Sequence, residues 1–359
     1  MKPSQRIPKS VKYLSQEQFF ELFDQFIKAG YKGKRTRKDG QTLRASSNDS
    51  FNATFKLLKR FTEVEKFNIK VPLPNHLSQS ELQRAAKYWL DFQIKFKNFL
   101  YDKEGHFDNY VGCTFKNLKT FLNYLNNDRL IYIGLFHRKF HVPSEDIPIV
   151  VLTPEQLKYL IHDEDLNSKL PNDLKVIRDI FVVGCSVALR YSDLMNLRPY
   201  NLEKKSGGVY LTVHSVKTST KTSIIIADYV HDIFKKYQKT QKTLLPTFTK
   251  GYLNLQLKKL ASYILSDEEM IKTRMRRGKQ VVIYKDPAKK KHYSLSDHIT
   301  THTMRRTAIT TMLLLGMPDQ FVRMISGHKK SSKEFFKYVE YTQNLLDSET
   351  QKIYSKLTK

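Results

Sequence analysis

The sequence predicts a mainly α-helical protein with a small antiparallel β-sheet, and three observations lead to this fold class. Apolar residues recur at three- and four-residue spacing through most of the first 138 residues, as in the segment 51–61. The same spacing returns in the second half, beginning with a largely buried helix expected over 173–189. Two short alternating runs, 209–214 and 223–227, flank a polar turn and predict a β-hairpin between the helices.

Composition narrows the class of protein. The 359 residues include 62 lysines and arginines against 35 acidic residues, and 62 − 35 gives a formal charge of +27. A surface this positive attracts polyanions such as nucleic acid, which speaks against an ordinary metabolic enzyme. Hydrophobic residues make up 40% of the chain and aromatic residues 12%, too much for a disordered basic tail.

The cysteines and apolar segments bear on the cellular compartment. Cys113 and Cys185 are the only cysteines, so the sequence offers neither a disulfide framework nor a zinc motif. The first residues lack the apolar run of a secretory signal, and the most apolar stretch, 181–189, is far shorter than the ~20 residues of a membrane span. We expect a soluble, cytoplasmic protein without a membrane partner.

Changes in pattern along the chain predict the domain organisation. Pro143 and Pro148 interrupt a stretch without helical period, as an extended linker would. After it, Thr153 and Gln156 form a capping box that starts a new helix. The expected parts are a basic tail (1–14), a helical domain (15–138), a linker (139–150), a mainly helical second domain with a small sheet (151–341) and a C-terminal tail (342–359).

Two stretches concentrate the positive charge. The first, 31–44, is basic and contains glycine, and the second, 272–291, carries nine basic residues and one acid around a strand-like run at 280–284. A solvated loop explains any one of these charges, but together they predict contacts to the phosphates of a nucleic acid. The candidate contact residues are Lys32, Lys34, Arg35, Arg37, Lys38, Arg44, Arg274, Arg276, Arg277 and Lys279.

Two segments place charged groups where helix packing does not require them. Arg190 follows the apolar helix, Ser192 is expected to cap a short helix after it, and Asp193 lies three residues beyond Arg190. Taken alone, such an arginine also satisfies the carbonyls of a helix end. His302 and Arg305 are three residues apart, on one face of a helix. An arginine fork and a histidine that converge on one spot can bind a phosphate.

Two further segments also place polar or charged residues where helix packing does not require them. Gly327 ends one helix and precedes His328, and Ser331 and Glu334 form the expected capping box of the next helix, which carries Tyr338. The turn of the predicted hairpin holds Lys217, and Lys221 is an equally good local candidate for a functional lysine.

Taken in order, these residues resemble the pattern of the tyrosine site-specific recombinases, also called phage integrases. The segments ALRYSDL, HTMRRTAITTMLLLG and SGHKKSSKEFFKYV are similar to integrases of Bacteroidetes mobile elements. The resemblance covers the second domain closely, and the N-terminal helices are similar, more loosely, to the family's SAM-like core-binding domain. The residues that reproduce the family pattern are Arg190, Lys217, His302, Arg305, His328 and Tyr338.

The resemblance implies a tyrosine nucleophile that becomes covalently joined to a 3′ phosphate. Tyr338 takes this role, with Tyr341 as the alternative, because Tyr338 lies ten positions after His328, about one more than is common in the family. An added residue in the polar turn between them is easily absorbed.

The remaining roles also follow from the resemblance. Arg190 and Arg305 hold the phosphate, while His302 and His328 donate hydrogen bonds and assist proton movement. Lys217, or Lys221 in its place, protonates the leaving 5′ oxygen. Asp193 orients and charge-balances an arginine or a histidine. The reaction needs no ATP, metal or other cofactor.

The expected partner is double-stranded DNA, held in a clamp of two basic domains. By the resemblance, the protein self-associates as a tetramer on two DNA sites, exchanges its C-terminal segment between protomers, and can work with an accessory DNA-bending protein at the nucleoid. Three alternatives remain open: a catalytically silent DNA-binding accessory protein, a DNA-relaxing enzyme like a type IB topoisomerase, and a basic RNA-binding protein.

Overall fold

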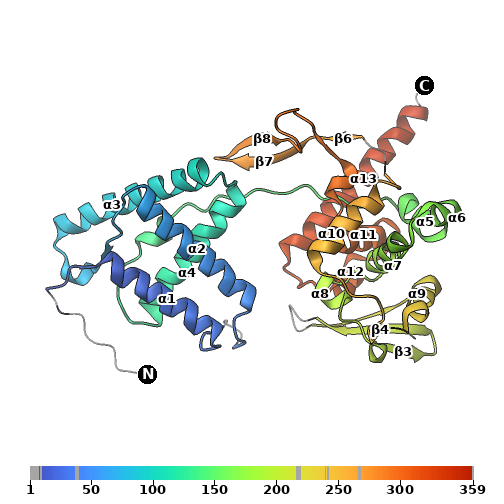
Figure 1. The fold of residues 1–359 in the computed structure, drawn as a ribbon, viewed down its shortest axis with the longest axis horizontal. Helices are drawn as coiled ribbons and strands as arrows, with labels where there is room; N and C mark the ends of the chain where they lie inside the picture. Colours follow the sequence, from blue (N-terminus) through green and yellow to red (C-terminus); the bar gives the residue numbers. More distant parts are fainter. Residues whose placement is uncertain are drawn as a thin grey trace. The chain divides into compact units, whose positions relative to one another are not determined.

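The computed structural model describes residues 8, 10–36, 40–215, 220–238, 240, 242–265 and 268–357. The chain divides into two compact units (Figure 1). The N-terminal unit comprises Met1–Ile147 and Thr273–Ile283, and the C-terminal unit comprises Pro148–Lys272 and Tyr284–Lys359. The first boundary lies inside the stretch expected to be a linker. The assignment of 273–283 differs from the expectation, which placed these residues with the second domain.

The N-terminal unit is a helical bundle. Its helices are α1 (Gln16–Tyr31), α2 (Ala45–Val64), α3 (Gln79–Asn98) and α4 (Asp108–Asn127). A π-helical turn, η2 (Phe99–Lys103), extends α3, and short 3-10 turns lie at Pro74–His76 and Phe136–Lys139. A two-residue antiparallel ladder joins β1 (Tyr13–Leu14) to β2 (Val71–Pro72). The helical periodicity of the sequence is confirmed here.

Aromatic rings form much of the core of this bundle. The rings of Phe23 and Phe121 stack with centroids 4.1 Å apart, which joins α1 to α4. Trp89 of α3 stacks at the same distance on Phe136. Such ring pairs bury large apolar areas and contribute specific geometry as well, so the aromatic content of the first 138 residues is explained by packing.

The C-terminal unit is mainly helical with small antiparallel sheets, as the sequence predicts (Figure 1). Its helices are α5 (Pro154–His162), α6 (Glu164–Lys169), α7 (Asn172–Val187), α8 (Tyr191–Leu194), α9 (Asp228–Gln238), α10 (Lys250–Ala261), α11 (Thr301–Leu314), α12 (Asp319–Ser326) and α13 (Lys333–Leu357). Short 3-10 turns lie at Pro199–Asn201 and Leu295–His298. The capping box at Thr153 and Gln156 is confirmed at the start of α5.

The predicted hairpin is confirmed as β4 (Gly208–His214) paired with β5 (Lys221–Ile225). A further strand that the sequence analysis did not identify, β3 (Leu202–Lys205), pairs with the other edge of β4. Its pattern is polar and largely exposed, so it lacks the alternation that identifies a half-buried strand. A second ladder in this unit joins β6 (Glu269–Met270) to β9 (Tyr293–Ser294).

The central helix α7 packs closely against α11. A Cβ added at Gly184 of α7 would meet the Sδ and Cβ of Met304 at 2.4 and 2.9 Å. Only a hydrogen atom fits at this crossing, so Gly184 sets the distance between the two helices. The spacing matters because α7 leads into Arg190 and α11 itself carries His302 and Arg305.

Two predicted helix starts are wrong by a residue or two. Ser192 was expected to cap the short helix, but Arg190 precedes α8 and its carbonyl accepts the amides of Asp193 and Leu194, both at 2.9 Å. At α13 the amide of Phe335 donates to the hydroxyl of Ser332, so Ser331 does not form the expected capping box. Adjacent serines offer the same cap chemistry, and the local backbone decides between them.

The C-terminal tail is not separate from the second domain in secondary structure, because α13 runs unbroken across the expected boundary at residue 341. The hairpin of β7 (Lys272–Arg276) and β8 (Lys279–Ile283) confirms the strand expected near 280–284. No helix among the described residues is both long enough and apolar enough to cross a membrane.

Replacing Gly184 with alanine should destabilise the C-terminal unit by about 1–3 kcal/mol, because the added methyl group forces α7 and α11 apart. Chemical denaturation followed by circular dichroism measures this. Gly251→Ala in α10 is the matched control, since a Cβ there meets nothing within 4 Å, and its unfolding should be unchanged or slightly more stable. Equal losses in both variants would contradict the role given to Gly184.

Candidate active site

Arg305 is a deeply buried member of the predicted site. It lies on α11 and is only 3% exposed. Its guanidinium donates to the carbonyl of Ala188 at 2.7 Å and to the carbonyl of Ser326 at 2.6 Å. These carbonyls belong to the ends of α7 and α12, where the helix dipole places negative partial charge. One buried cation therefore joins two helix ends.

The same burial shifts the acidity of this group. Burial lowers the pKa of Arg305 to about 10, and the nearby charge of Arg190 acts in the same direction. Tyr338 and Asp193 act in the opposite direction. Arg305 thus remains a cation at neutral pH, and its charge interacts with those of all three residues.

Arg190 lies between α7 and α8 and is tied to the end of β4. Its guanidinium donates to the hydroxyl of Ser215 at 3.1 Å, and that hydroxyl donates to the carboxylate of Asp193 at 2.9 Å. Asp193 is 3% exposed. The turn that aims Arg190 begins at Ala188, which ends α7 with the left-handed φ of +54°. A buried carboxylate and a bridging serine thereby position the first arginine.

His328 lies directly after α12. Gly327 ends this helix with a φ of +63°, a conformation that suits glycine, and confirms the predicted helix end. The imidazole Nδ1 is 2.7 Å from the hydroxyl of Ser326, and the Nε2 is 3.3 Å from the guanidinium of Arg305. Burial and the positive charges of Arg305 and Arg190 lower the pKa of His328 to about 3. The ring is therefore neutral at physiological pH.

His302 lies in the first turn of α11, whose N-terminus is capped by the hydroxyl of Thr300. Its side chain is exposed, unlike that of Arg305 one turn later. The charge of His302 also lowers the pKa of His328, so the two histidines lie within electrostatic reach of each other. The helical face expected from the i, i+3 spacing is thus directed to the same region as Arg305.

Tyr338 lies on α13 and is 4% exposed, packed with Ala188, Ile309 and Phe335. Its ring centroid is 6.0 Å from that of His328. Tyr341, the alternative nucleophile, lies on the same helix and is half-buried, and burial raises the pKa of its hydroxyl. Among the two tyrosines, Tyr338 is the one that influences Arg305.

Lys217 lies outside the described residues. Two described residues that flank this segment are close to the site: Ser215 contacts Arg190, and Thr220 lies 3.2 Å from where a Cβ of Gly327 would be. Lys221, the alternative, is described; it begins β5, pairs with His214 and is exposed.

Three residues of this region were missed by the sequence analysis. Ser215 bridges Arg190 and Asp193, and Ser326 contacts both Arg305 and His328. Arg323 packs its guanidinium 4.7 Å from the ring of Phe335 and lowers the pKa of His328. Isolated serines and a helical arginine carry no sequence pattern that separates them from ordinary surface residues, so only their placement reveals them.

The basic stretch 31–44 is only partly directed to solvent. Lys32 and Lys34 are exposed. Arg35 instead lies 3.3 Å from the centroid of Phe26 and donates to that residue's carbonyl, and burial lowers its pKa to about 10. Arg44 precedes α2 and is half-buried. Arg37 and Lys38 lie outside the described residues.

The arginines of the β7–β8 hairpin contact carboxylates and carbonyls of the N-terminal unit. Arg274 pairs with Glu145, Arg277 pairs with Asp102, and Arg276 donates to the carbonyl of Tyr101. Lys279, by contrast, is exposed. Three of the four residues proposed here as DNA contacts are thus engaged within the protein.

Comparison with known proteins shows the family and the fold of this chain. The model of the phage integrase family matches residues 151–344, more than half of the chain. The structure is similar to a lambda integrase dimer bound to a core site, with a TM-score of 0.55 and 12% identity over 92% of this chain and 78% of that one. No curated protein matches by sequence.

Two further solved structures have the same fold. The Tn1549 transposon integrase in complex with transposon right-end DNA gives a TM-score of 0.55 with 14% identity, over 95% of this chain and all of that one. The XerH site-specific recombinase bound to its difH substrate gives a TM-score of 0.55 with 11% identity, over 93% of this chain and 96% of that one.

The fold and the converging residues define a DNA strand breaking and rejoining enzyme of the tyrosine recombinase class. The chain belongs to the phage integrase family.

The histidine pKa gives a direct test of this geometry. Because His328 titrates at about 3 when folded and at its ordinary 6.5 when unfolded, it makes the folded state less stable as the pH falls from about 6.5 toward 3. Arg190→Gln should raise the folded pKa of His328, since it removes a nearby positive charge. An NMR titration of the imidazole measures the pKa of His328 in the folded wild type and in the folded variant. Arg198→Gln is the control, and an ordinary titration near 6.5 in the wild type would contradict the burial of His328.

Proposed function

We propose that this protein is a site-specific DNA recombinase in which Tyr338 is the nucleophile. The observation that carries the proposal is the convergence of Arg190, Arg305, His328 and Tyr338, brought together by the buried Arg305 guanidinium between α7 and α12. Two arginines beside a tyrosine and a histidine make a site for one phosphodiester.

The proposed reaction is an in-line displacement at phosphorus. The hydroxyl of Tyr338 gives up its proton with the assistance of His302, its oxygen forms a bond to phosphorus, and the bond from phosphorus to the 5′ oxygen breaks. The arginine forks stabilise the negative charge that collects on the non-bridging oxygens. Because the phosphotyrosine retains the bond energy of the phosphodiester, the reverse attack by a 5′ hydroxyl rejoins the strand without ATP or metal.

A general acid must protonate the leaving 5′ oxygen, and we assign this role to Lys217. The supports are the sequence pattern and the position of Ser215, which contacts Arg190. Nearby positive charge favours the neutral form of a lysine and so makes it a better proton donor. His302 and His328 would donate hydrogen bonds to the phosphate, while Asp193 positions Arg190 through Ser215.

The assembly is proposed from the same comparisons. A lambda integrase tetramer bound to a Holliday junction is similar to this structure, with a TM-score of 0.57. We therefore expect this protein to bind duplex DNA and to act as a tetramer on two sites, with an accessory DNA-bending protein as an additional partner. The far part of α13 exposes Leu346 and Tyr354, which suits a contact between protomers. We place this activity in the cytoplasm, on nucleoid DNA.

The nucleophile is tested by trapping the covalent intermediate. A nicked DNA substrate from the flanks of the protein's own gene should yield a protein–DNA adduct, because the short strand leaves and prevents rejoining. Tyr338→Phe should abolish the adduct, whereas Tyr341→Phe should retain it. Arg305→Lys should slow adduct formation roughly 10²- to 10³-fold through loss of the planar fork. An undiminished adduct with Tyr338→Phe would refute the assignment.

The general acid is tested by changing the leaving group. Lys217→Ala should cleave an ordinary phosphodiester slowly but should recover on a substrate with sulfur in place of the 5′ oxygen, because a thiolate leaves without protonation. Lys221→Ala serves as the comparison and should behave as the wild type on both substrates. Recovery in the Lys221 variant alone would transfer the role to that residue.

A further inference from the structure

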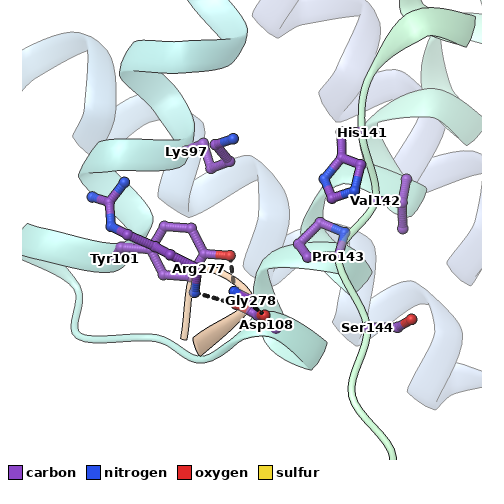
Figure 2. Close-up of a pocket in the computed structure, with 9 residues that line it drawn as sticks. All are labelled: Lys97, Tyr101, Asp108, His141, Val142, Pro143, Ser144, Arg277 and Gly278. Carbon is purple, nitrogen blue, oxygen red and sulfur yellow. Dashed lines mark hydrogen bonds between the residues drawn. The ribbon is translucent and has the colours of Figure 1, made fainter. Parts of the chain in front are cut away.

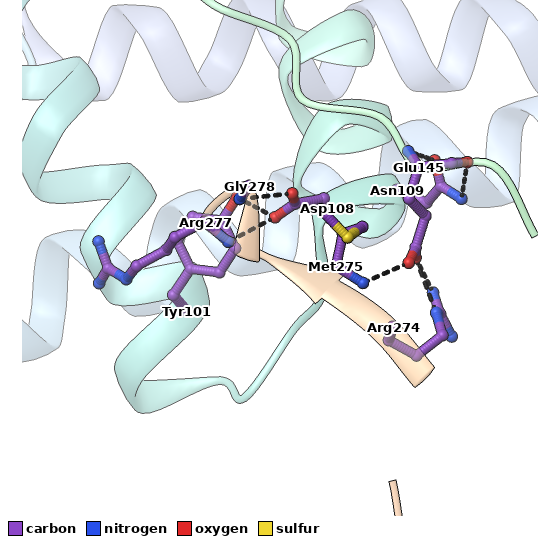
Figure 3. Close-up of polar contacts among 8 residues, drawn as sticks. All are labelled: Tyr101, Asp108, Asn109, Glu145, Arg274, Met275, Arg277 and Gly278. Carbon is purple, nitrogen blue, oxygen red and sulfur yellow. Dashed lines mark hydrogen bonds and ion pairs between the residues drawn. The ribbon is translucent and has the colours of Figure 1, made fainter. Parts of the chain in front are cut away.

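The β7–β8 hairpin ends in a tight turn whose amides bind a carboxylate. Arg277 and Gly278 have φ values of +56° and +73°, as in a two-residue type I′ turn. Their amides have no partner within such a hairpin, yet they donate to the two carboxylate oxygens of Asp108 at 2.8 and 2.9 Å (Figure 3). Consecutive amides of this kind form an anion-binding nest. Asp108, 2% exposed, fills it.

A second buried carboxylate holds the first strand of the hairpin. Glu145, whose side chain is 2% exposed, accepts hydrogen bonds from the guanidinium of Arg274 at 2.7 Å and from the amide of Met275 at 2.5 Å (Figure 3). The backbone of Glu145 is in turn held by two hydrogen bonds with the side chain of Asn109. Burial of a charge is costly unless it is paired and hydrogen-bonded, so both carboxylates require the hairpin.

The surface that receives the hairpin is built on the π-helical turn at the end of α3. Tyr101, 1% exposed, donates its hydroxyl to Asp108 at 2.7 Å. The next residue, Asp102, pairs with Arg277 at 2.5 Å. Turns of this type are rare and occur mostly where a helix is adapted to a function. A cavity of about 420 Å³ lies beside the turn amides and is lined by Lys97 and His141 (Figure 2).

The connections of the hairpin to the C-terminal unit are very short. Ile271 alone separates the end of β6 from the start of β7. On the other side, Lys285 already pairs with Asp297 of the C-terminal unit at 2.8 Å, so only Tyr284 intervenes. One extended residue spans at most about 3.6 Å. A hairpin docked on Asp108 and Glu145 therefore leaves almost no slack on either side.

We propose that residues 272–283 are a strap, a part of the C-terminal sequence that docks on the N-terminal unit and limits how far the two units can separate. The strap acts alongside the covalent connection at 147–148. Release of the turn from Asp108 and of Arg274 from Glu145 is then required before the units move apart. This inference goes beyond the proposed function and does not depend on the chemistry at Tyr338.

The strap also gives a physical reason for the placement of its arginines. While it is docked, Arg274, Arg276 and Arg277 direct their donors to Glu145 and to the π-helical turn. An unattached hairpin would present the same groups to solvent. Docking therefore converts positive charge that the sequence suggests for DNA into a contact within the chain.

Hydrogen exchange of the full chain without DNA tests the strap. In the wild type the amides of Met275, Arg277 and Gly278 should be protected. The double variant Asp108→Asn, Glu145→Gln should speed their exchange roughly ten- to a hundredfold, as expected for the loss of hydrogen bonds to charged groups. Exchange in α7 and α11 should not change. The control Glu63→Gln, Glu65→Gln removes the same charge from exposed positions of the N-terminal unit.

A distance measurement tests the tether itself. Spin labels on the exposed Cys113 and on Tyr200→Cys, which is in the C-terminal unit and exposed in the wild type, report the separation of the two units. The distribution of distances should broaden in the double variant and not in the control. The single variant Glu145→Gln leaves the pair of Tyr101 and Asp108 intact, so it gives the same test if the double variant folds poorly.

Fast exchange of the three amides in the wild type would overturn the strap, and so would an unchanged distance distribution in the variants. Both measurements are made without DNA cleavage. Failure of the strap with normal adduct formation would therefore leave the recombinase proposal intact, and the reverse result would leave the strap intact.

Discussion

The hydrogen bonds of the Arg305 guanidinium to the carbonyls of Ala188 and Ser326 are the interaction on which the site depends. They join the ends of α7 and α12, and each end leads directly into a predicted site residue, Arg190 or His328. A planar fork with several donors can satisfy two carbonyls in fixed directions at once, which a lysine cannot. The same buried cation therefore meets a structural requirement and the proposed catalytic one, and loss of it would disturb the site and the packing together.

Electrostatics around this cation explain the states of its neighbours. Burial and the surrounding positive charges keep His328 neutral, so its ring can accept or donate a hydrogen bond without adding to the local charge. Asp193 offsets part of that charge and holds Arg190 through Ser215. A region rich in cations, with the buried carboxylate of Asp193 nearby, is suited to a phosphate, whose negative charge compensates the arginines.

The excess positive charge of the chain therefore has more than one role. Arg190 and Arg305 belong to the candidate site, whereas Lys32 and Lys279 are exposed and suited to phosphate contacts. A third group is used within the protein: Arg35 covers aromatic rings, and Arg274 and Arg277 hold the strap. Net charge alone cannot separate these groups, because it contains no information on which carboxylates or rings lie nearby in space.

The sequence by itself determined what local physics controls. Helical periodicity, the capping box at Thr153, the glycine end of α12 and the i, i+3 pair of His302 and Arg305 depend on residues a few positions apart, and each is present in the structure. The ordered site residues also identified the family, which the comparison shows. Tertiary structure alone decided the convergence of the site segments, the bridging by Ser215 and the docking of 273–283 on Asp108 and Glu145. Those contacts join residues far apart in sequence, and their free energy depends on burial and on the direction of each hydrogen bond, which no local pattern encodes.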